Sequence, residues 1–66
     1  MSAPPRATEQ LVEEILRLHA CPLTLDELVI ETGQTRRTIE RALEAMRDRG
    51  RADFLLDQGL RLWQLR

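Results

Sequence analysis

The chain has 66 residues, a formal net charge of −1 and a single cysteine. A chain of about 60 residues forms one small domain that buries only about 60% of its unfolded surface, which excludes a deep catalytic cleft lined by several loops. One cysteine excludes an internal disulfide and a multi-cysteine metal site. Because no run of 18 apolar residues and no signal-peptide segment is present, we expect a cytoplasmic protein with no membrane partner.

A polar stretch with two adjacent prolines opens the chain, and we expect residues 1–7 to form a disordered leader to a domain spanning 8–66. Thr8 is a favourable N-cap residue for a first helix that should run to about residue 19. Apolar residues recur at helical spacing along this helix, which predicts one broad buried face. The predicted face consists of Leu11, Val12, Ile15, Leu16 and Leu18.

The connection after the first helix contains the cysteine, followed by a proline. We expect Cys21 to be a small buried apolar residue. We expect Leu23 to pair briefly as a strand. His19 stands near the end of the helix, where a protonated imidazole interacts favourably with the helix dipole. Because the sequence offers no second histidine and no nearby set of ligands, we assign His19 a structural role and expect no metal site.

The stretch from residue 24 to residue 50 is the most informative part of the chain. Thr24 and Glu27 have the spacing of a capping box at the start of a second helix, expected over about 25–32. Gly33 suits the left-handed conformation that ends a helix, and Thr35 can cap the next one. Two helices joined by such a tight turn form a helix-turn-helix candidate, a unit that presents one helix to a DNA groove.

The third helix should run from residue 36 to about 49 and end at Gly50. Its apolar residues follow the i, i+3, i+4, i+7 pattern of one buried stripe. The stripe consists of Ile39, Ala42, Leu43 and Met46. The opposite face and its flanks carry the charged residues Arg36, Arg37, Glu40, Arg41, Glu44 and Asp48. The sequence therefore predicts a buried helix whose exposed start is rich in arginine.

After Gly50 the sequence changes to a strand pattern. Two short strands are expected over 51–56 and 60–65, joined by a three-residue connection in which Gly59 is available for a positive φ. The alternation is imperfect because Phe54, Leu55 and Leu56 are consecutive, so the pattern leaves open which side of the hairpin faces the helices. We expect Trp63 to lie in the core and to close the hairpin onto the helices.

The order helix, brief strand, helix, turn, helix, hairpin resembles the winged helix-turn-helix family of DNA-binding domains, from about residue 8 to residue 66. The resemblance implies a mainly α fold with a small β-hairpin, the wing. It also implies a small transcriptional regulator of bacterial or phage type that binds double-stranded DNA, sequence-specifically or generally. In this family the third helix enters the major groove and the wing contacts the backbone.

The resemblance assigns DNA contacts to specific positions of this chain. Residues at the start of the third helix match positions that face bases, and the implied set is Arg36, Arg37, Glu40 and Arg41. Thr35 and Thr38 match positions that often bind phosphates. Arg61 of the wing is expected to reach the backbone, although Asp57 at the same tip opposes this contact. An arginine fork on guanine is the commonest specific contact in such complexes.

Charge is divided unequally between the two halves of the chain. Residues 1–33 contain two arginines and six acidic residues, a net of −4, whereas residues 34–66 contain eight arginines and five acidic residues, a net of +3. Such asymmetry favours nucleic-acid contact. The near-neutral total and the acidic residues of the third helix, Glu40, Glu44 and Asp48, favour the alternative of a protein–protein interaction module.

Some properties of the assembly and its chemistry follow from size and composition. A module this small buries only about 600–1,000 Å² on DNA as a monomer, so useful affinity suggests a homodimer or a partner protein. No glycine-rich phosphate loop and no Ser/His/Asp arrangement is present. We therefore expect no enzymatic activity and no cofactor.

Overall fold

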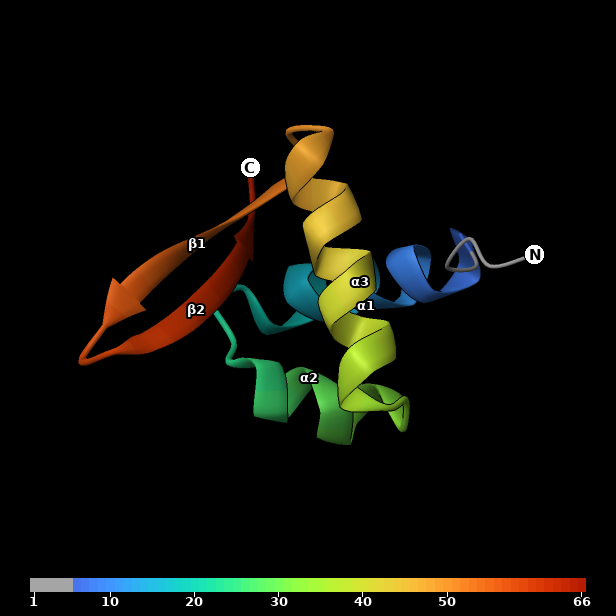
Figure 1. Ribbon diagram of the computed structural model, residues 1–66, viewed down its shortest axis with the longest axis horizontal. Coiled ribbons are helices and arrows are strands. Elements are labelled where there is room, and N and C mark those ends of the chain that lie inside the picture. The colour runs from blue at the N-terminus through green and yellow to red at the C-terminus, as the bar shows by residue number, and fades with distance from the viewer. Residues whose placement is uncertain (1–5) are drawn as a thin grey trace.

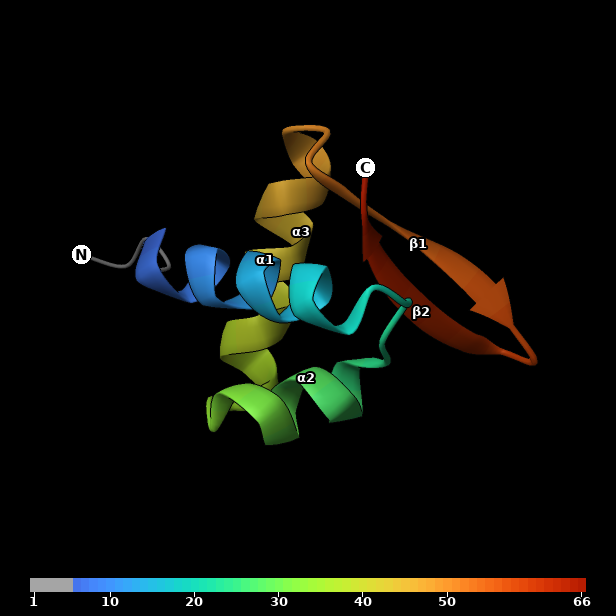
Figure 2. The ribbon, with the colours of Figure 1, turned by 180° about the vertical axis from the view of Figure 1, so that it is seen from behind.

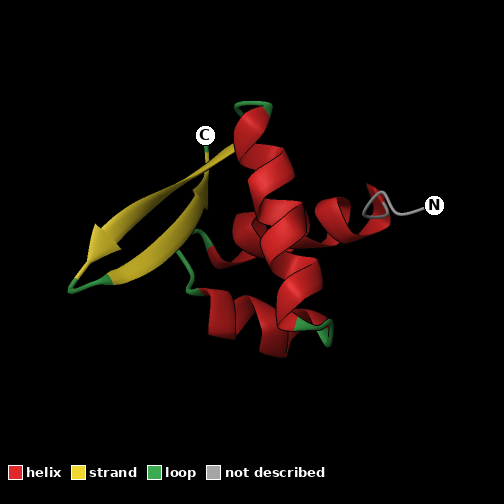
Figure 3. Ribbon diagram, in the orientation of Figure 1, coloured by secondary structure: helices red, strands yellow, loops and turns green. Residues whose placement is uncertain are grey.

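The computed structural model describes residues 6–66, so most of the expected leader, residues 1–5, lies outside the described residues. The elements are α1 (Arg6–His19), α2 (Leu25–Thr32), α3 (Arg36–Asp48), β1 (Ala52–Asp57) and β2 (Leu60–Leu65). The helices pack together and the hairpin extends to one side of them (Figures 1 and 3). This confirms the predicted fold class, a mainly α domain with the element order of a winged helix-turn-helix.

Helix α1 begins earlier than predicted, within the segment expected to be a leader, and ends at His19 as predicted. It begins at Arg6, so Thr8 is a buried residue inside the helix and not the N-cap. Leu18 has an exposed fraction of 81% and Leu11 is also exposed, so the predicted buried face was too broad. These two leucines are seven residues apart and share one flank of the helix, outside the stripe that meets the core. The buried side chains of α1 are Thr8, Glu9, Val12, Ile15 and Leu16.

In the connection between α1 and α2, the prediction for Cys21 is wrong and the prediction for Leu23 is confirmed. Cys21 is exposed, contrary to the prediction, because it lies in the turn after α1 and the next apolar residue, Leu23, takes the buried position. Leu23 pairs with Trp63 of β2 as predicted for a brief strand. The Leu23 N–H donates to the Trp63 carbonyl at 2.9 Å, and the Trp63 N–H donates to the Leu23 carbonyl at 2.7 Å. This pair of bonds ties the start of the helix-turn-helix to the hairpin.

The caps of α2 and the N-terminal cap of α3 are the predicted ones. Thr24 and Glu27 form a complete capping box at the start of α2. Gly33 ends α2 in the left-handed conformation with φ 71°, and its N–H donates to the Val29 carbonyl. Thr35 caps α3 through its hydroxyl, which accepts from the N–H of Thr38. Local sequence therefore determines where both helices of the motif begin and where the first one ends.

A single hydrophobic core holds the helices and the base of the hairpin together. Figure 2 shows α1 crossing α3, with α2 packed beside the lower end of α3. The predicted stripe of α3 is buried at all four positions, and Trp63 is buried as expected. The core cluster consists of Val12, Ile15, Leu16, Leu23, Leu28, Ile39, Leu43, Met46, Ala52 and Trp63. Phe54 packs against its edge, with its ring centroid 5.1 Å from that of Trp63.

The first strand of the hairpin is shifted by one residue from its predicted bounds, whereas β2 has the predicted bounds. Strand β1 begins at Ala52 and includes Asp57, which leaves a two-residue loop of Gln58 and Gly59. Both loop residues have positive φ, 52° and 81°, as a type I′ turn requires. Phe54 pairs with Trp63 on the face that meets the core. Leu55 pairs with Leu62 and therefore lies on the opposite face, because side chains alternate along a strand.

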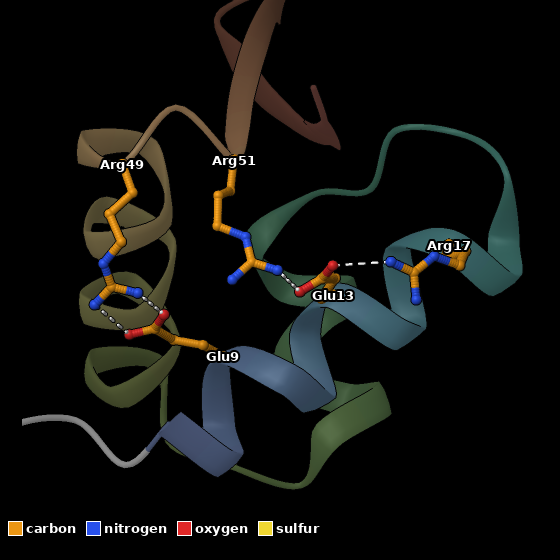
Figure 4. Close-up of polar contacts among 5 residues, drawn as sticks. All are labelled: Glu9, Glu13, Arg17, Arg49 and Arg51. Carbon is orange, nitrogen blue, oxygen red and sulfur yellow. Dashed lines mark hydrogen bonds and ion pairs between the residues drawn. The ribbon is translucent and has the colours of Figure 1, made fainter.

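Two carboxylates of α1 fix the segment between α3 and the hairpin (Figure 4). Glu9 accepts from both terminal nitrogens of Arg49, at 2.5 and 3.3 Å. Glu13 accepts from Arg51 at 2.6 Å and from Arg17 at 2.8 Å. Because Arg49 and Arg51 flank the turn that leads into β1, these ion pairs position the base of the wing relative to α1.

Candidate nucleic-acid interface

The outward face of α3 presents two arginines at its N-terminal half. Arg37 and Arg41 are exposed and lie one helical turn apart, on the side of the helix opposite its buried stripe. Among residues 6–66, neither guanidinium takes part in an ion pair or a hydrogen bond. On the same face, the C-terminal half carries Glu44 and Asp48. The outward face is therefore positive at the start of the helix and negative towards its end.

Arg36 has a different environment from Arg37 and Arg41. Its guanidinium forms an ion pair with Asp26 in the first turn of α2. The two side chains are 57% and 68% exposed, and exposed pairs of this kind contribute only about 0–1 kcal/mol. A ligand phosphate therefore has to compete with Asp26 for Arg36, at a small cost.

The hydroxyl groups of the two threonines at the start of α3 already form hydrogen bonds within the helix. Besides the capping bond, the hydroxyls of Thr35 and Thr38 lie 2.8 Å apart, so one donates to the other. One hydroxyl proton of the pair stays free to donate to an external acceptor. The first turn of α3 contains no acidic residue, so the unpaired N–H groups and the positive end of the helix dipole are not neutralised there.

The wing arginine points towards the helices and not beyond the wing tip. Arg61 lies opposite Leu56, and the carbon at the centre of its guanidinium is 4.8 Å from the centroid of the Phe54 ring. Arg47 of α3 lies at the same distance from this ring. The Nε of Arg47 is also 3.6 Å from a carboxylate oxygen of Asp53. Stacking on the ring orients both cations, and because Arg47 also pairs with Asp53, it is Arg61 whose N–H groups stay free to bind an anion.

A groove of about 320 Å³ separates α3 from the wing. It is lined by Thr24, Leu25, Asp26, Arg36, Glu40, Leu43, Glu44, Gly59, Leu60, Arg61 and Trp63. Three of these residues are acidic and two are arginines, so the groove is slightly negative. Among the described residues, Glu40 and Glu44 form no ion pair, whereas Asp26 is paired with Arg36.

The structure therefore divides the predicted site residues between two surfaces. Arg36, Glu40 and Arg61 line the groove, while Arg37 and Arg41 lie outside it on the outward face of α3. Thr35 and Thr38 lie at the start of α3. The set of residues expected to contact DNA did not include Arg47. Because Arg47 follows Glu40 by seven residues, it lies on the same side of the helix as Glu40.

Comparison with known proteins returns no family model, no curated protein and no solved structure that matches the chain. In the part of the chain from residue 6 onwards, no helix combines the length and the apolar character needed to cross a bilayer. Over the same residues, His, Cys, Asp and Glu side chains do not gather in groups of three or more that suit a metal ion.

Proposed function

We propose that this protein is a small regulator that binds double-stranded DNA, with the N-terminal half of α3 in the major groove. The observation that carries the proposal is the exposure of Arg37 and Arg41 without a partner in the described structure. A guanidinium that has no internal ion pair keeps its full charge and its donor fork for a phosphate or a guanine edge. The proposal includes cytoplasmic localisation, as expected for a transcriptional regulator.

The charge gradient along α3 supports an approach by its N-terminal end. Helix-turn-helix proteins place the first turns of the second motif helix against base edges. Here those turns carry Arg36, Arg37 and Arg41 against one acidic residue, Glu40, and the helix end adds its own positive dipole. Tilting the C-terminal half away from the duplex keeps its carboxylates from the phosphates. Arg61 then supplies a backbone contact from the wing.

The size of the domain bears on the assembly that would bind DNA. A single module of this kind buries about 600–1,000 Å², which gives modest affinity at physiological salt. We therefore propose that the protein acts as a homodimer or together with a partner protein. It needs neither a cofactor nor a catalytic group for this role.

Duplex binding can be tested by fluorescence anisotropy with a labelled mixed-sequence duplex at several salt concentrations. Affinity should fall steeply as salt rises, because neutralising phosphates releases counterions. Arg37→Ala and Arg41→Ala should each weaken binding by about tenfold, since one arginine contact is worth roughly 1–3 kcal/mol. Their melting temperatures should stay within about 2 °C of the parent, because both side chains are exposed.

Arg17→Ala is the matched control for these variants. It removes one positive charge from α1, where Glu13 is the one ion-pair partner of the guanidinium among residues 6–66. Its duplex affinity should change by less than about twofold, since net charge alone has a small effect at physiological ionic strength. Absence of duplex binding at low salt, or equal losses in Arg17→Ala and Arg37→Ala, would contradict the proposal.

A protein-interaction role is the second candidate function. It is favoured by the groove beside α3, where Glu40 and Glu44 have no ion-pair partner among residues 6–66 and would repel a phosphate backbone.

A further inference from the structure

The groove between α3 and the wing combines apolar walls with an acidic side. Leu25 of α2 and Leu60 of β2 line it together with Trp63. Leu60 is 59% exposed and Leu25 is half-buried, so both present apolar surface to solvent inside the groove. The cavity volume of about 320 Å³ lies at the low end of ligand sites and accommodates a few side chains.

The charges along the groove do not cancel one another evenly. At one end Asp26 is neutralised by Arg36, and on the wing Arg61 rests on the ring of Phe54. Glu40 and Glu44, an i, i+4 pair on α3, line the same groove. Like charges at this spacing destabilise a helix by a few tenths of a kcal/mol. A cation placed between the two carboxylates would relieve this repulsion and gain from both charges.

We propose that this groove docks a short basic segment of a partner protein. An aliphatic side chain of that segment lies against Leu25, Leu60 and Trp63, and a neighbouring lysine or arginine pairs with Glu40 and Glu44. Charge complementarity favours this occupant over a nucleic acid, because in the described structure the groove residues without an ion pair are two carboxylates, Glu40 and Glu44, against one guanidinium, Arg61. The site deepens the interaction role named above and does not depend on duplex binding by Arg37 and Arg41.

The direct test uses a fluorescein-labelled peptide of alternating leucine and lysine, titrated into the full-length protein. Two comparison peptides replace lysine with glutamate or leucine with serine. The leucine–lysine peptide should bind, with shifts in the amide resonances of Leu25 and Leu60 and in the indole N–H of Trp63. Both comparison peptides should bind at least about tenfold more weakly, because one lacks the cations that pair with the carboxylates and the other lacks the aliphatic side chains. No binding of the first peptide at millimolar concentration overturns the proposal.

Two pairs of substitutions separate the groove from general electrostatic attraction. Glu40→Gln with Glu44→Gln should weaken peptide binding by about tenfold, the combined effect of two exposed ion pairs. The control, Glu14→Gln with Asp48→Asn, removes two exposed carboxylates outside the groove and changes the net charge equally. It should weaken binding by less than about twofold. Equal losses in the two double variants overturn the proposal.

The apolar half of the site has its own control. Leu60→Ser should weaken peptide binding, whereas Leu18→Ser, at a leucine still more exposed but on α1, should leave it unchanged. Circular dichroism of each variant checks that the fold is retained. If the groove resonances of the free protein shift with its own concentration and sedimentation shows a dimer, a second copy occupies the groove and the proposal is wrong. Failure here leaves the duplex-binding test unaffected, since that test uses different residues.

Discussion

The ion pair between Glu9 and Arg49 provides the sharpest test of what holds this small domain together. The Glu9 side chain is only 8% exposed, whereas that of Arg49 is 50% exposed. Two hydrogen bonds join the groups across 40 residues of sequence, from the first turn of α1 to the end of α3. Figure 4 shows the carboxylate of Glu9 facing the guanidinium fork of Arg49.

Glu9→Gln keeps the size of the side chain and removes its charge. Breaking a fully buried ion pair costs about 3–5 kcal/mol, and an exposed pair is worth about 0–1 kcal/mol. Arg49 can regain water on its exposed side and the new amide can still accept one hydrogen bond. We therefore expect a loss of about 1–2 kcal/mol in the free energy of unfolding. The total free energy of unfolding of a domain of this size is roughly 3–10 kcal/mol. A loss of about 1–2 kcal/mol should lower the melting temperature by roughly 4–16 °C.

Urea and thermal unfolding, followed by circular dichroism and by the fluorescence of Trp63, measure this loss. Glu14→Gln is the control, because Glu14 is exposed on the same helix and has no ion pair in the described structure. It should change the free energy of unfolding by less than about 0.5 kcal/mol. A double-mutant cycle with Arg49→Gln should give a coupling energy of about 1 kcal/mol. If Glu9→Gln and Glu14→Gln unfold at the same urea concentration, the ion pair between Glu9 and Arg49 does not stabilise the fold and the reasoning fails.

Three further predictions test the core, the wing and the proposed duplex interface. Leu43→Ala should lower the free energy of unfolding by roughly 2–5 kcal/mol, since the side chain is fully buried. Two-state melting near the parent temperature would contradict the burial of Leu43. Gln58→Asn should raise stability by up to about 1 kcal/mol in urea unfolding, because Asn-Gly suits a type I′ turn; a loss would show that the turn geometry is wrong. Glu40→Gln should tighten duplex binding about two- to fivefold in anisotropy titrations, by removing a carboxylate beside the arginines, with Glu14→Gln unchanged; weaker binding would instead make Glu40 a base contact.

The helix-turn-helix was accessible from the sequence because short-range chemistry specifies it. The capping box at Thr24, the left-handed Gly33 and the cap at Thr35 each act within a few residues, so local sequence contains the whole signal. The buried stripe of α3 repeats at helical spacing and was predicted at every position. The cluster of arginines at the start of α3 was likewise visible without a structure.

The exposure of a side chain was not predictable in this way where it depends on residues far away in the sequence. Leu18 is apolar but exposed, because burial depends on which flank of α1 meets the rest of the core. Cys21 is exposed because it lies in the turn after α1, where Leu23 takes the buried position. Three consecutive apolar residues in β1 left the inner face of the hairpin undecided. The pairing of Phe54 with Trp63 decides it, since a register shift of one residue would move every side chain to the other face.

The sequence by itself determined the element order, the caps, the core of α3 and the presence of arginines at its start. Tertiary structure decided the environment of each arginine of the predicted site. Arg36 meets Asp26 from the preceding helix, Arg61 turns onto Phe54, and Arg37 and Arg41 remain on the outward face. The physical reason is range: caps and periodic stripes act over a few residues, whereas ion pairs and stacking require groups that only the folded chain brings together.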